Sequence, residues 1–273
     1  MAKTVDEIGQ LREFLRRHPR LVVLTGAGIS AASGIPTYRD DSGTWRYRTP
    51  IQHQDFLRDK ATRQRYWARS MAGWPTLRDA LPNAAHHAIA RLESRGNIET
   101  VITQNVDRLH QRAGSRRVID LHGRVDRVRC MHCGALSERE ALQSWLEQHN
   151  SLDIAGTRAR PDGDSDIAAT DLAQFVVPDC DHCGGDLTPD VVFYGGNVPR
   201  ARVDSCRLAI ERADALLVVG SSLQVYSGYR FCRLAATAGK PLAIINTGVT
   251  RADQQATLRL FEPAASLLHG ALV

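Results

Sequence analysis

Four short apolar runs stand out along the 273-residue chain, and each is continuous in Val, Ile, Leu or Ala rather than alternating with polar residues. The runs lie within residues 20–28, 99–105, 215–223 and 240–248. Continuous runs are typical of parallel strands that are buried on both faces of a sheet. Helical patterns at residues 83–96 and 201–214 precede the second and third runs. This alternation predicts an α/β fold with an open, doubly wound parallel sheet.

Each predicted strand ends in a polar or glycine-rich tip, where the ligands of such a sheet are expected to gather. The tips are residues 26–30, 104–107, 220–222 and 246–248. Two segments interrupt the pattern: residues 41–79 predict a helical insertion, and residues 125–197 hold four of the six cysteines and predict a small domain. The large domain is therefore expected to be discontinuous and Rossmann-like, built from residues 1–40, 80–124 and 198–273.

The chain carries a formal net charge of +5, mostly from arginine, because lysine occurs only at Lys3, Lys60 and Lys240. The arginines are scattered rather than clustered, so we expect no nucleic-acid partner. No run reaches the roughly 18 apolar residues that a membrane span needs, and residues 1–20 lack the apolar core of a cleavable signal. We expect a cytoplasmic monomer without a membrane partner, whose first helix lies on the surface and begins near Thr4.

Four cysteines form two C-x-x-C pairs, Cys130 with Cys133 and Cys180 with Cys183. A glycine follows each pair and permits a tight turn that points backbone amides at the thiolates. Two such turns supply the four ligands of a tetrahedral zinc ion, which has no open position and is therefore expected to be structural. The alternatives are disulfides, which a cytosolic setting disfavours, and a thioredoxin-like redox pair, which would need only one such turn.

Four other residues bear on this cysteine prediction. His132 and His182 lie inside the two turns and are the alternative ligands. Cys206 and Cys232 lie in apolar helical segments, away from the paired cysteines in the sequence. We expect these two to be buried structural thiols.

The first predicted strand leads into a turn, GAGISA at residues 26–31, that matches the first half of the dinucleotide-binding pattern G-x-G-x-x-G/A. Gly26 and Gly28 would allow a diphosphate to approach the backbone closely, and a helix starting near Ile29 would direct its amides at the phosphates. A dehydrogenase also needs a second strand that ends in an acid about 20 residues later. Residues 33–48 have the composition of turns instead. The sequence thus predicts dinucleotide binding without the full dehydrogenase pattern.

Polar side chains gather at the ends of two further segments. Gln104, Asn105 and Asp107 follow the second apolar run, and His122 precedes a glycine. Two carboxamides, a carboxylate and an imidazole at neighbouring strand ends can orient a ribose, bind a leaving amide and accept a proton. A satisfied core histidine is the alternative for His122, and it is the preferred interpretation of His110.

Seven motifs follow one another along the chain: GAGISAASGIPTYR, TQNVDRLH, LHG, the paired C-x-x-C, PDVVFYG, GSSL and INTG. They resemble the motifs of the sirtuins, the NAD-dependent protein deacylases, and occur in the same order. The likeness covers nearly the whole chain, and RQRYWARSMAGWP, GSSLQVYSGYRF and ARPDGDSD are most similar to the class II branch. It implies that NAD, as co-substrate, binds between the large domain and a small domain with one structural zinc ion. An acyl-lysine of a protein substrate enters from the opposite side of the cleft.

The resemblance also implies site residues. Residues 34–46 would form a mobile loop over the cofactor, and the catalytic residues would be Gln104, Asn105, Asp107 and His122. The implied NAD-binding residues are Gly26, Ala27, Gly28, Ile29, Ser30, Ile35, Pro36, Tyr38, Arg39, Trp45, Gln104, Asn105, Val106, Asp107, Gly220, Ser221, Ser222, Asn246, Thr247, Gly248 and Ala264.

In the reaction that the resemblance implies, the acyl oxygen attacks C1′ of the nicotinamide ribose as nicotinamide leaves, giving an alkylimidate. His122 then accepts a proton through the ribose hydroxyls, so that the 2′ oxygen attacks the imidate carbon. Water completes the transfer, and the products are nicotinamide, O-acyl-ADP-ribose and free lysine. A mono-ADP-ribosyltransferase, which shares the first step, is the nearest alternative. An NAD-dependent dehydrogenase and a zinc-ribbon nucleic-acid binder fit the motifs poorly.

The substrate side is expected at the PDVVFYG motif and on the helical insertion. Val191, Phe193 and Gly195 would line the lysine tunnel and pair with an extended peptide. An ordinary core strand is the alternative for this motif, and it would be preferred without the resemblance. Tyr66 and Arg69 have the Tyr-x-x-Arg spacing with which some sirtuins hold the distal carboxylate of an acidic acyl group. An amphipathic surface helix is the alternative for these two residues.

Three positions depart from the usual sirtuin pattern. Thr37 replaces an aspartate, Gly196 replaces an acid, and Thr247 replaces a bulkier residue. The first two changes remove negative charge near the expected cleft. The behaviour of the cofactor loop and the peptide preference are therefore left open by the sequence.

Overall fold

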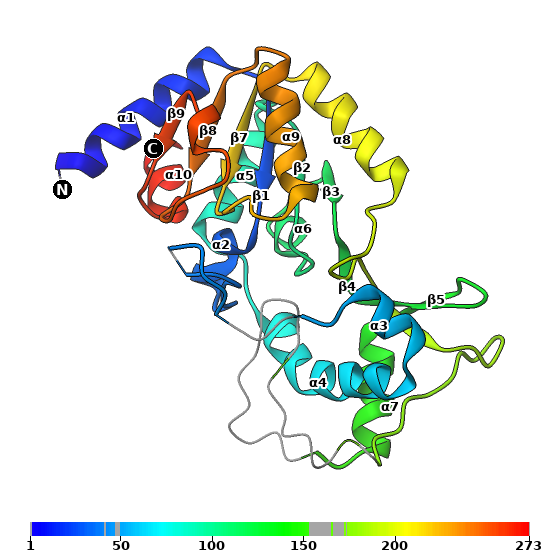
Figure 1. Cartoon of the computed structure of the whole chain (residues 1–273). Coiled ribbons are helices and arrows are strands. Elements are labelled where there is room, and N and C mark those ends of the chain that lie inside the picture. Colours follow the sequence, from blue (N-terminus) through cyan, green and yellow to red (C-terminus); the bar gives the residue numbers. More distant parts are fainter. Residues whose placement is uncertain are drawn as a thin grey trace.

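The computed structural model describes residues 2–40, 42–46, 50–152, 165, 172 and 174–272, and the side chains from residue 6 onwards. These residues form two lobes, a larger one around a parallel sheet and a smaller one of helices and short strands (Figure 1). Parts of the long polar segment between the two cysteine pairs lie outside the described residues.

The larger lobe is built on a six-stranded sheet in which all neighbouring strands run parallel. The strands lie in the order β3-β2-β1-β7-β8-β9, which is the order of a doubly wound dinucleotide-binding sheet. Their bounds are β1 Leu21–Thr25, β2 Ile98–Thr103, β3 Val118–Asp120, β7 Ala215–Val219, β8 Leu242–Ile245 and β9 Leu258–Leu260. The predicted α/β fold is confirmed.

Helices cover both faces of this sheet, which explains why its strands are continuously apolar. Val23 of β1 belongs to the apolar cluster on one face, while its neighbour Val22 belongs to the cluster on the other. The first face is covered by α1 (Ala2–Arg17), α5 (Ala84–Ser94) and α10 (Ala264–Leu272). The second is covered by α8 (Arg200–Arg212) and α9 (Tyr226–Thr237). Four short elements complete the lobe: α2 (Ala27–Ser30), η1 (Ala31–Ser33), α6 (Leu109–Arg112) and η3 (Asp253–Gln255).

In its described residues, the smaller lobe contains a three-stranded antiparallel sheet and three helices. Its strands lie in the order β5-β4-β6, with β4 Gly123–Cys130, β5 Leu136–Glu138 and β6 Leu187–Val191. Its helices are α3 His53–Arg58, α4 Lys60–Asp79 and α7 Arg139–His149. Helix α4 begins at its cap, since the Asp59 carboxylate accepts hydrogen bonds from the amides of Ala61 and Thr62.

The predicted helical insertion is present as α3 and α4, and it shares one apolar core with the small sheet. Phe56 of α3 and Trp67 of α4 pack in the same cluster as Val128 of β4 and Leu146 of α7. Trp67 also donates a hydrogen bond from Nε1 to the carbonyl oxygen of Leu187, at 3.2 Å. The insertion therefore packs as part of the smaller lobe.

Two details differ from the expectations. The helix after the first strand begins at Ala27 rather than near Ile29, and it continues only to Ser30 before a 3-10 turn follows. The N-terminal helix is not purely a surface element, because Leu11 and Phe14 are buried against the sheet. Within the described part of the chain, no helix combines the length and apolar character needed to cross a membrane.

Candidate active site

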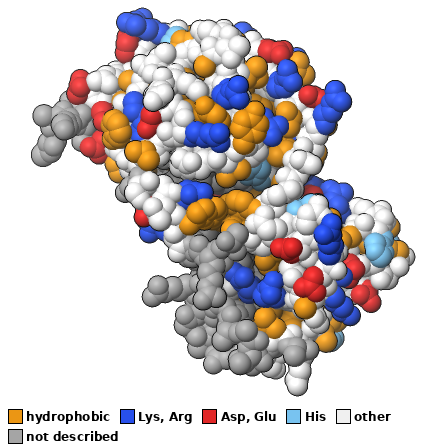
Figure 2. All heavy atoms as spheres, viewed as in Figure 1, with side chains coloured by type: hydrophobic (Ala, Val, Ile, Leu, Met, Phe, Trp, Pro, Cys, Tyr) orange, Lys and Arg blue, Asp and Glu red, His pale blue; other side chains and the backbone are white. Residues whose placement is uncertain are grey.

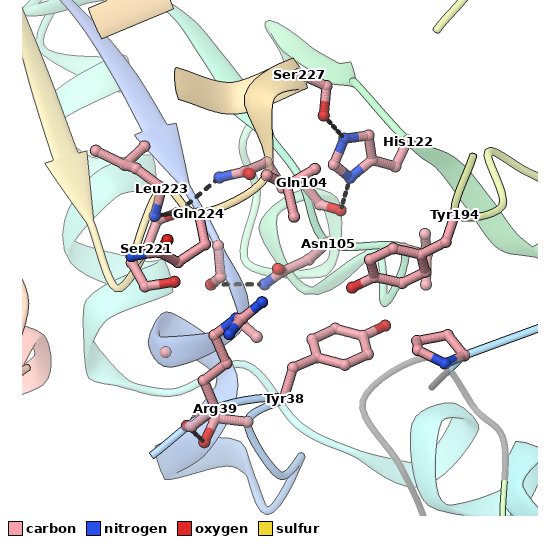
Figure 3. A pocket seen from close by; sticks show the side chains of 18 of the residues that line it. Tyr38, Arg39, Gln104, Asn105, His122, Tyr194, Ser221, Leu223, Gln224 and Ser227 are labelled. Carbon is pink, nitrogen blue, oxygen red and sulfur yellow. Dashed lines mark hydrogen bonds between the residues drawn. The ribbon is translucent and has the colours of Figure 1, made fainter. Parts of the chain in front are cut away.

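A cavity of about 430 Å³ opens at the carboxyl ends of β1, β2, β7 and β8, where the two lobes meet. This volume suits a small-molecule ligand, and the position is the one at which doubly wound sheets bind their ligands. Residues from all four predicted strand tips line it. Figure 3 shows Gln104, Asn105 and Ser221 from two of these tips. The lining residues among those implied by the resemblance are Gly26, Ala27, Gly28, Ser30, Ile35, Tyr38, Arg39, Trp45, Gln104, Asn105, Val106, Asp107, His122, Gly220, Ser221, Ser222, Asn246, Thr247 and Gly248.

The turn glycines are also required for packing within the protein. A Cβ on Gly26 would lie 2.8 Å from Cβ of Ser221, and a Cβ on Gly28 would lie 2.8 Å from the Gly220 carbonyl oxygen. Gly220 has a φ of 61°, and a Cβ there would lie 2.2 Å from the Ile29 amide nitrogen. These glycines let the turns after β1 and β7 pack directly on each other. The floor of the cavity depends on that contact.

The two carboxamides at the end of β2 are fixed by their nitrogen atoms. Gln104 Nε2 donates to Ser221 Oγ at 2.9 Å and to the Thr25 carbonyl oxygen at 3.1 Å. Asn105 Nδ2 donates to the Gly26 carbonyl oxygen at 3.1 Å and to Ser30 Oγ at 3.0 Å. With both nitrogens engaged within the protein, the amide oxygens are the atoms that can accept hydrogen bonds from a ligand.

Asp107 is a buried carboxylate at the cavity wall, with only 8% of the residue exposed. Its Oδ2 accepts a hydrogen bond from Ser30 Oγ at 2.7 Å, and its Oδ1 accepts one from the Leu109 amide at 3.0 Å. Burial raises the pKa of this carboxyl, while these two donors oppose the shift. The arrangement fixes a hydrogen-bond acceptor at the wall of the cavity.

His122 is held through both of its ring nitrogens (Figure 3). Nδ1 lies 3.0 Å from the Gln104 carbonyl oxygen, and Nε2 lies 2.7 Å from Ser227 Oγ. A carbonyl oxygen can only accept, so Nδ1 carries the proton of the neutral ring and Nε2 is an acceptor. Burial lowers the pKa of His122 to about 4, and the positive charges of Arg202 and Arg230 act in the same direction. The ring is therefore neutral near pH 7 and can accept a proton at Nε2.

His110 is a core histidine, as preferred from the sequence. It is 1% exposed, its Nε2 lies 2.9 Å from Thr25 Oγ1, and burial lowers its pKa to about 3. Its ring packs edge-on against His86 with centroids 4.9 Å apart. Both rings lie within the core of the larger lobe, and neither lines the cavity.

The four paired cysteines converge at one end of the smaller lobe. Their sulfur atoms all lie within 4.8 Å of one another, with Cys130 and Cys183 at 3.5 Å and Cys133 and Cys180 at 3.8 Å. Sulfur ligands of a tetrahedral zinc ion with Zn–S bonds of about 2.3 Å lie about 3.8 Å apart, so the set fits zinc. No two of the six cysteines form a disulfide.

Backbone geometry prepares these cysteines for a metal. The amides of Cys133 and His132 donate to Cys130 Sγ at 3.4 and 3.3 Å, and these bonds lower the pKa of Cys130 to about 6. The glycines after the pairs, Gly134 and Gly184, have φ angles of 74° and 67°, as a tight turn requires. None of the four cysteines lines the cavity, which agrees with a structural metal rather than a catalytic one.

The two unpaired cysteines are buried, as predicted. Cys206 and Cys232 are each 0% exposed and lie in the apolar cluster under α8 and α9. Burial raises the pKa of both thiols to about 12. A thiol with such a pKa is protonated and inert near neutral pH.

Comparison with known proteins identifies the family. A model of the Sir2 family matches residues 26–227, which span the cavity and the cysteine cluster. The chain belongs to the Sir2 family. It is 52% identical to an NAD-dependent protein deacetylase of Bordetella bronchiseptica, over 98% of both chains. It is 44% identical to the NAD-dependent protein deacylase Sirt4 of Drosophila melanogaster, over 93% of this chain and 83% of that one. A solved structure of Sir2 with a p53 peptide and NAD+ is similar at a TM-score of 0.78 and 32% identity, over 95% of this chain and 94% of that one.

In this Sir2-family chain, residues 34–46 were expected to form a loop over the cofactor. The described residues of this segment form a hydrogen-bonded turn. Arg39 pairs with Trp45 through a backbone bridge, and its guanidinium stacks 4.2 Å from the centre of the indole. Asp40 Oδ1 accepts hydrogen bonds from Ser42 and from the Thr44 amide. Thr37, the unusual residue, donates from Oγ1 to the Arg39 carbonyl oxygen at 2.8 Å and so becomes part of this turn.

On the expected substrate side, Val191, Phe193 and Gly195 all line the cavity. The Phe193 ring stacks on Phe56 with centroids 4.6 Å apart. Hydrophobic side chains gather on the surface where the two lobes meet (Figure 2), and the exposed Tyr226 lies on the cavity rim. An apolar entrance of this kind suits the methylene chain of a lysine.

The expected acyl clamp is only half in contact with the cavity. Tyr66 lines it, with 7% of the residue exposed, and its ring packs edge-on against Phe193 at 5.3 Å. Arg69 is not among the lining residues. Its Nε donates to the Ser165 carbonyl oxygen at 2.8 Å. The clamp stays a prediction that requires the guanidinium to reach the cavity.

Three of the expected NAD contacts lie outside the lining. Ile29 is 2% exposed in the core of the sheet, and Ala264 begins α10 and packs against the same core. Pro36 lies in the turn between two lining residues. Sequence reasoning missed other lining residues, among them Ser227, Arg230 and Tyr194. Ser227 and Arg230 follow the strand tip at Ser221 within a few residues, and extending that tip into α9 would have found them.

Proposed function

We propose that this chain is an NAD-dependent protein lysine deacylase that releases nicotinamide, O-acyl-ADP-ribose and free lysine. The observation that carries the proposal is the neutral His122 in the cavity wall, with Nε2 free of its proton. It lines the same cavity as the fixed carboxamides of Gln104 and Asn105 and the carboxylate of Asp107. The names of the Bordetella and Drosophila relatives support the same activity.

The cavity residues divide the task along the sheet. NAD supplies an electrophilic C1′ with nicotinamide as the leaving group. The amide oxygens of Gln104 and Asn105 and the Asp107 carboxylate accept hydrogen bonds from the nicotinamide amide and the ribose hydroxyls. Residues at the β1, β7 and β8 tips hold the phosphates and the adenosine end, and His122 accepts the proton at Nε2. In this division of roles the strand ends would orient NAD, and His122 would act as the general base.

The protein substrate is an acylated lysine in an extended peptide. β6 is an edge strand of the small sheet, and an edge strand can pair with an added peptide strand. Val191 and Phe193, at and beyond the end of β6, are placed for the lysine tunnel. We include in the proposal the three-part division of the chain, one structural zinc at the four cysteines, and action as a cytoplasmic monomer without nucleic-acid or membrane partners.

The proposal also includes a preference among acyl groups. Tyr66 and Arg69 lie one turn apart on α4, and an arginine at the end of the acyl tunnel would favour succinyl or glutaryl over acetyl groups. A Tyr66→Phe, Arg69→Met double variant then loses that preference. A double variant with an unchanged order of acyl groups would exclude the clamp without affecting the deacylase proposal.

A panel of acetyl-, succinyl-, glutaryl- and lipoyl-lysine peptides tests the function. Each peptide is incubated with NAD, and released nicotinamide and acyl-ADP-ribose are measured together by mass spectrometry. We expect both products to form in parallel with at least one acyl group. Nicotinamide release with ADP-ribose attached to protein, and no acyl-ADP-ribose, would instead identify a mono-ADP-ribosyltransferase.

A further inference from the structure

A serine of α9 contacts the proton-accepting atom of His122 at the wall of the cavity. Ser227 is the second residue of α9, 105 positions along the chain from His122, and its Oγ lies 2.7 Å from Nε2. Figure 3 shows Ser227 and the Gln104 carbonyl oxygen approaching different nitrogens of the imidazole. Both Ser227 and His122 line the cavity.

The direction of this hydrogen bond follows from the partner of Nδ1. Because Nδ1 donates to the Gln104 carbonyl, Nε2 of the neutral ring has only a lone pair, and the Ser227 hydroxyl must donate to it. A hydroxyl can also rotate and accept. Ser227 can therefore bond to Nε2 before the ring is protonated and again after Nε2 carries a proton.

The close approach of α9 makes this contact possible. A Cβ on Gly228 would lie 2.4 Å from Gln104 Oε1, so the first turn of the helix is packed directly against the carboxamide. This packing brings Ser227, the residue before Gly228, to His122, while Gly228 leaves room for Gln104. The first turn of α9 thus contacts His122, the expected base, and also the side chain of Gln104. The backbone carbonyl of Gln104 is the group that orients His122.

We propose that Ser227 is a positioning residue that holds His122 with its Nε2 lone pair in the cavity until a ribose hydroxyl of NAD donates to it. In that step the ribose O–H bond breaks and an Nε2–H bond forms, so the imidazole becomes cationic, while the electron pair left on the ribose oxygens serves the attack of the 2′ oxygen on the imidate carbon. The Ser227 hydroxyl then turns and accepts from Nε2–H. This inference rests on the proposed deacylase function. It adds a residue to the second half of that reaction, in which His122 accepts a proton.

The first test separates the two halves of the reaction. Exchange of labelled nicotinamide into NAD needs only the first step, whereas formation of acyl-ADP-ribose needs the proton transfer to His122. Ser227→Thr and Ser227→Val have the same shape and differ in the hydroxyl. We expect Val to lower kcat for deacylation roughly five- to tenfold, the range of one lost hydrogen bond. Nicotinamide exchange and KM for NAD should not change, and Thr should behave like the wild type.

Thr237→Val, an exposed residue at the other end of α9, is the matched control and should change neither rate. A Ser227→Val variant in which exchange and deacylation fall together, or in which neither falls, would overturn the positioning role. A wild-type protein that forms no acyl-ADP-ribose would contradict the deacylase function itself, so the two failures are distinguishable.

The second test needs no cofactor. In protein with ¹⁵N-labelled histidine, the Nε2 resonance of His122 should be that of an unprotonated nitrogen that accepts a hydrogen bond. Ser227→Val should move this resonance, and Ser227→Thr should not. The positive charges of Arg202 of α8 and Arg230 of α9 act on the ring, the Gln104 carbonyl binds Nδ1, and all three groups are kept in both variants. An Nε2 resonance that is the same in the Val variant as in the wild type would exclude the contact.

Discussion

The nitrogens of His122 have partners of opposite character, and this decides what the ring can do. Nδ1 is committed to a backbone carbonyl, which cannot move without moving β2, while Nε2 is bound by a side-chain hydroxyl that can rotate. The rigid partner selects the tautomer, and the rotatable one leaves the other nitrogen available. A low pKa keeps the ring neutral in cofactor-free protein. The residue is thus prepared as a base before any ligand binds.

His122→Ala removes that base. We expect deacylation to fall by about 10²–10⁴, the range for loss of a positioned general base. The Kd for NAD, measured by calorimetry, should change little, because the strand tips that hold the rest of the cofactor are intact. Near-wild-type deacylation by the alanine variant would contradict the assignment of His122.

The buried pair His86 and His110 makes stability depend on pH. Burial lowers their pKa values to about 4 and about 3 from an ordinary value of 6.5. At a pH between the unfolded pKa of 6.5 and these folded pKa values, the unfolded chain binds protons that the folded chain does not. The free energy of unfolding therefore falls as the pH decreases from 7 towards 4. At pH 5 each histidine should lower it by about 2 kcal/mol.

Urea unfolding at pH 7, 6 and 5 measures this dependence. His110→Asn should lessen this dependence and leave the part that comes from His86 and His122, and His269→Gln, on an exposed position of α10, should leave it as in the wild type. A free energy of unfolding that stays constant between pH 7 and 5 would show that the pair is not buried in its neutral form.

At the scale of elements, hydrophobic pattern was enough to predict the centre of the sheet but not its edges. The four continuous apolar runs became β1, β2, β7 and β8. The edge strands β3 and β9 have three residues each, too few for a pattern to be recognised, and they form because a neighbouring strand is already in place.

The site was predictable to the extent that its residues lie in contiguous strand tips. Gln104, Asn105 and Asp107 are adjacent in sequence, and they line the cavity as expected. Ser227 meets His122 only through the packing of α9, and Gly26 meets Ser221 only through the packing of two turns. Contacts between distant segments depend on tertiary structure and leave no local signal in one sequence.

A change in either of the two cysteine turns should weaken zinc binding by both turns, because they bind a single ion. We expect about one zinc per chain by elemental analysis, and loss of most of it in Cys180→Ser, since the remaining three thiolates bind more weakly. Thermal stability should fall with the zinc content. Cys206→Ala, which removes a buried thiol outside the cluster, should lower stability without changing the zinc content; zinc retained in full by Cys180→Ser would contradict the four-cysteine site.

At the scale of the whole molecule, the cavity is built from both lobes. The larger lobe supplies the strand tips and His122, and the smaller lobe supplies Phe193 and Tyr66. The helical insertion and the small sheet share an apolar core, so these elements are expected to move as a unit against the larger lobe. This arrangement places the cofactor side and the lysine side of the reaction on different bodies, with the reacting atoms between them.

The central claim is that NAD is consumed in step with the removal of an acyl group. The most direct test is the stoichiometry of one reaction with an acyl-lysine peptide, followed by mass spectrometry and by absorbance of NADH. We predict one nicotinamide and one O-acyl-ADP-ribose for each deacylated lysine, with no NADH. Formation of NADH, or deacylation that proceeds without loss of NAD, would contradict the account.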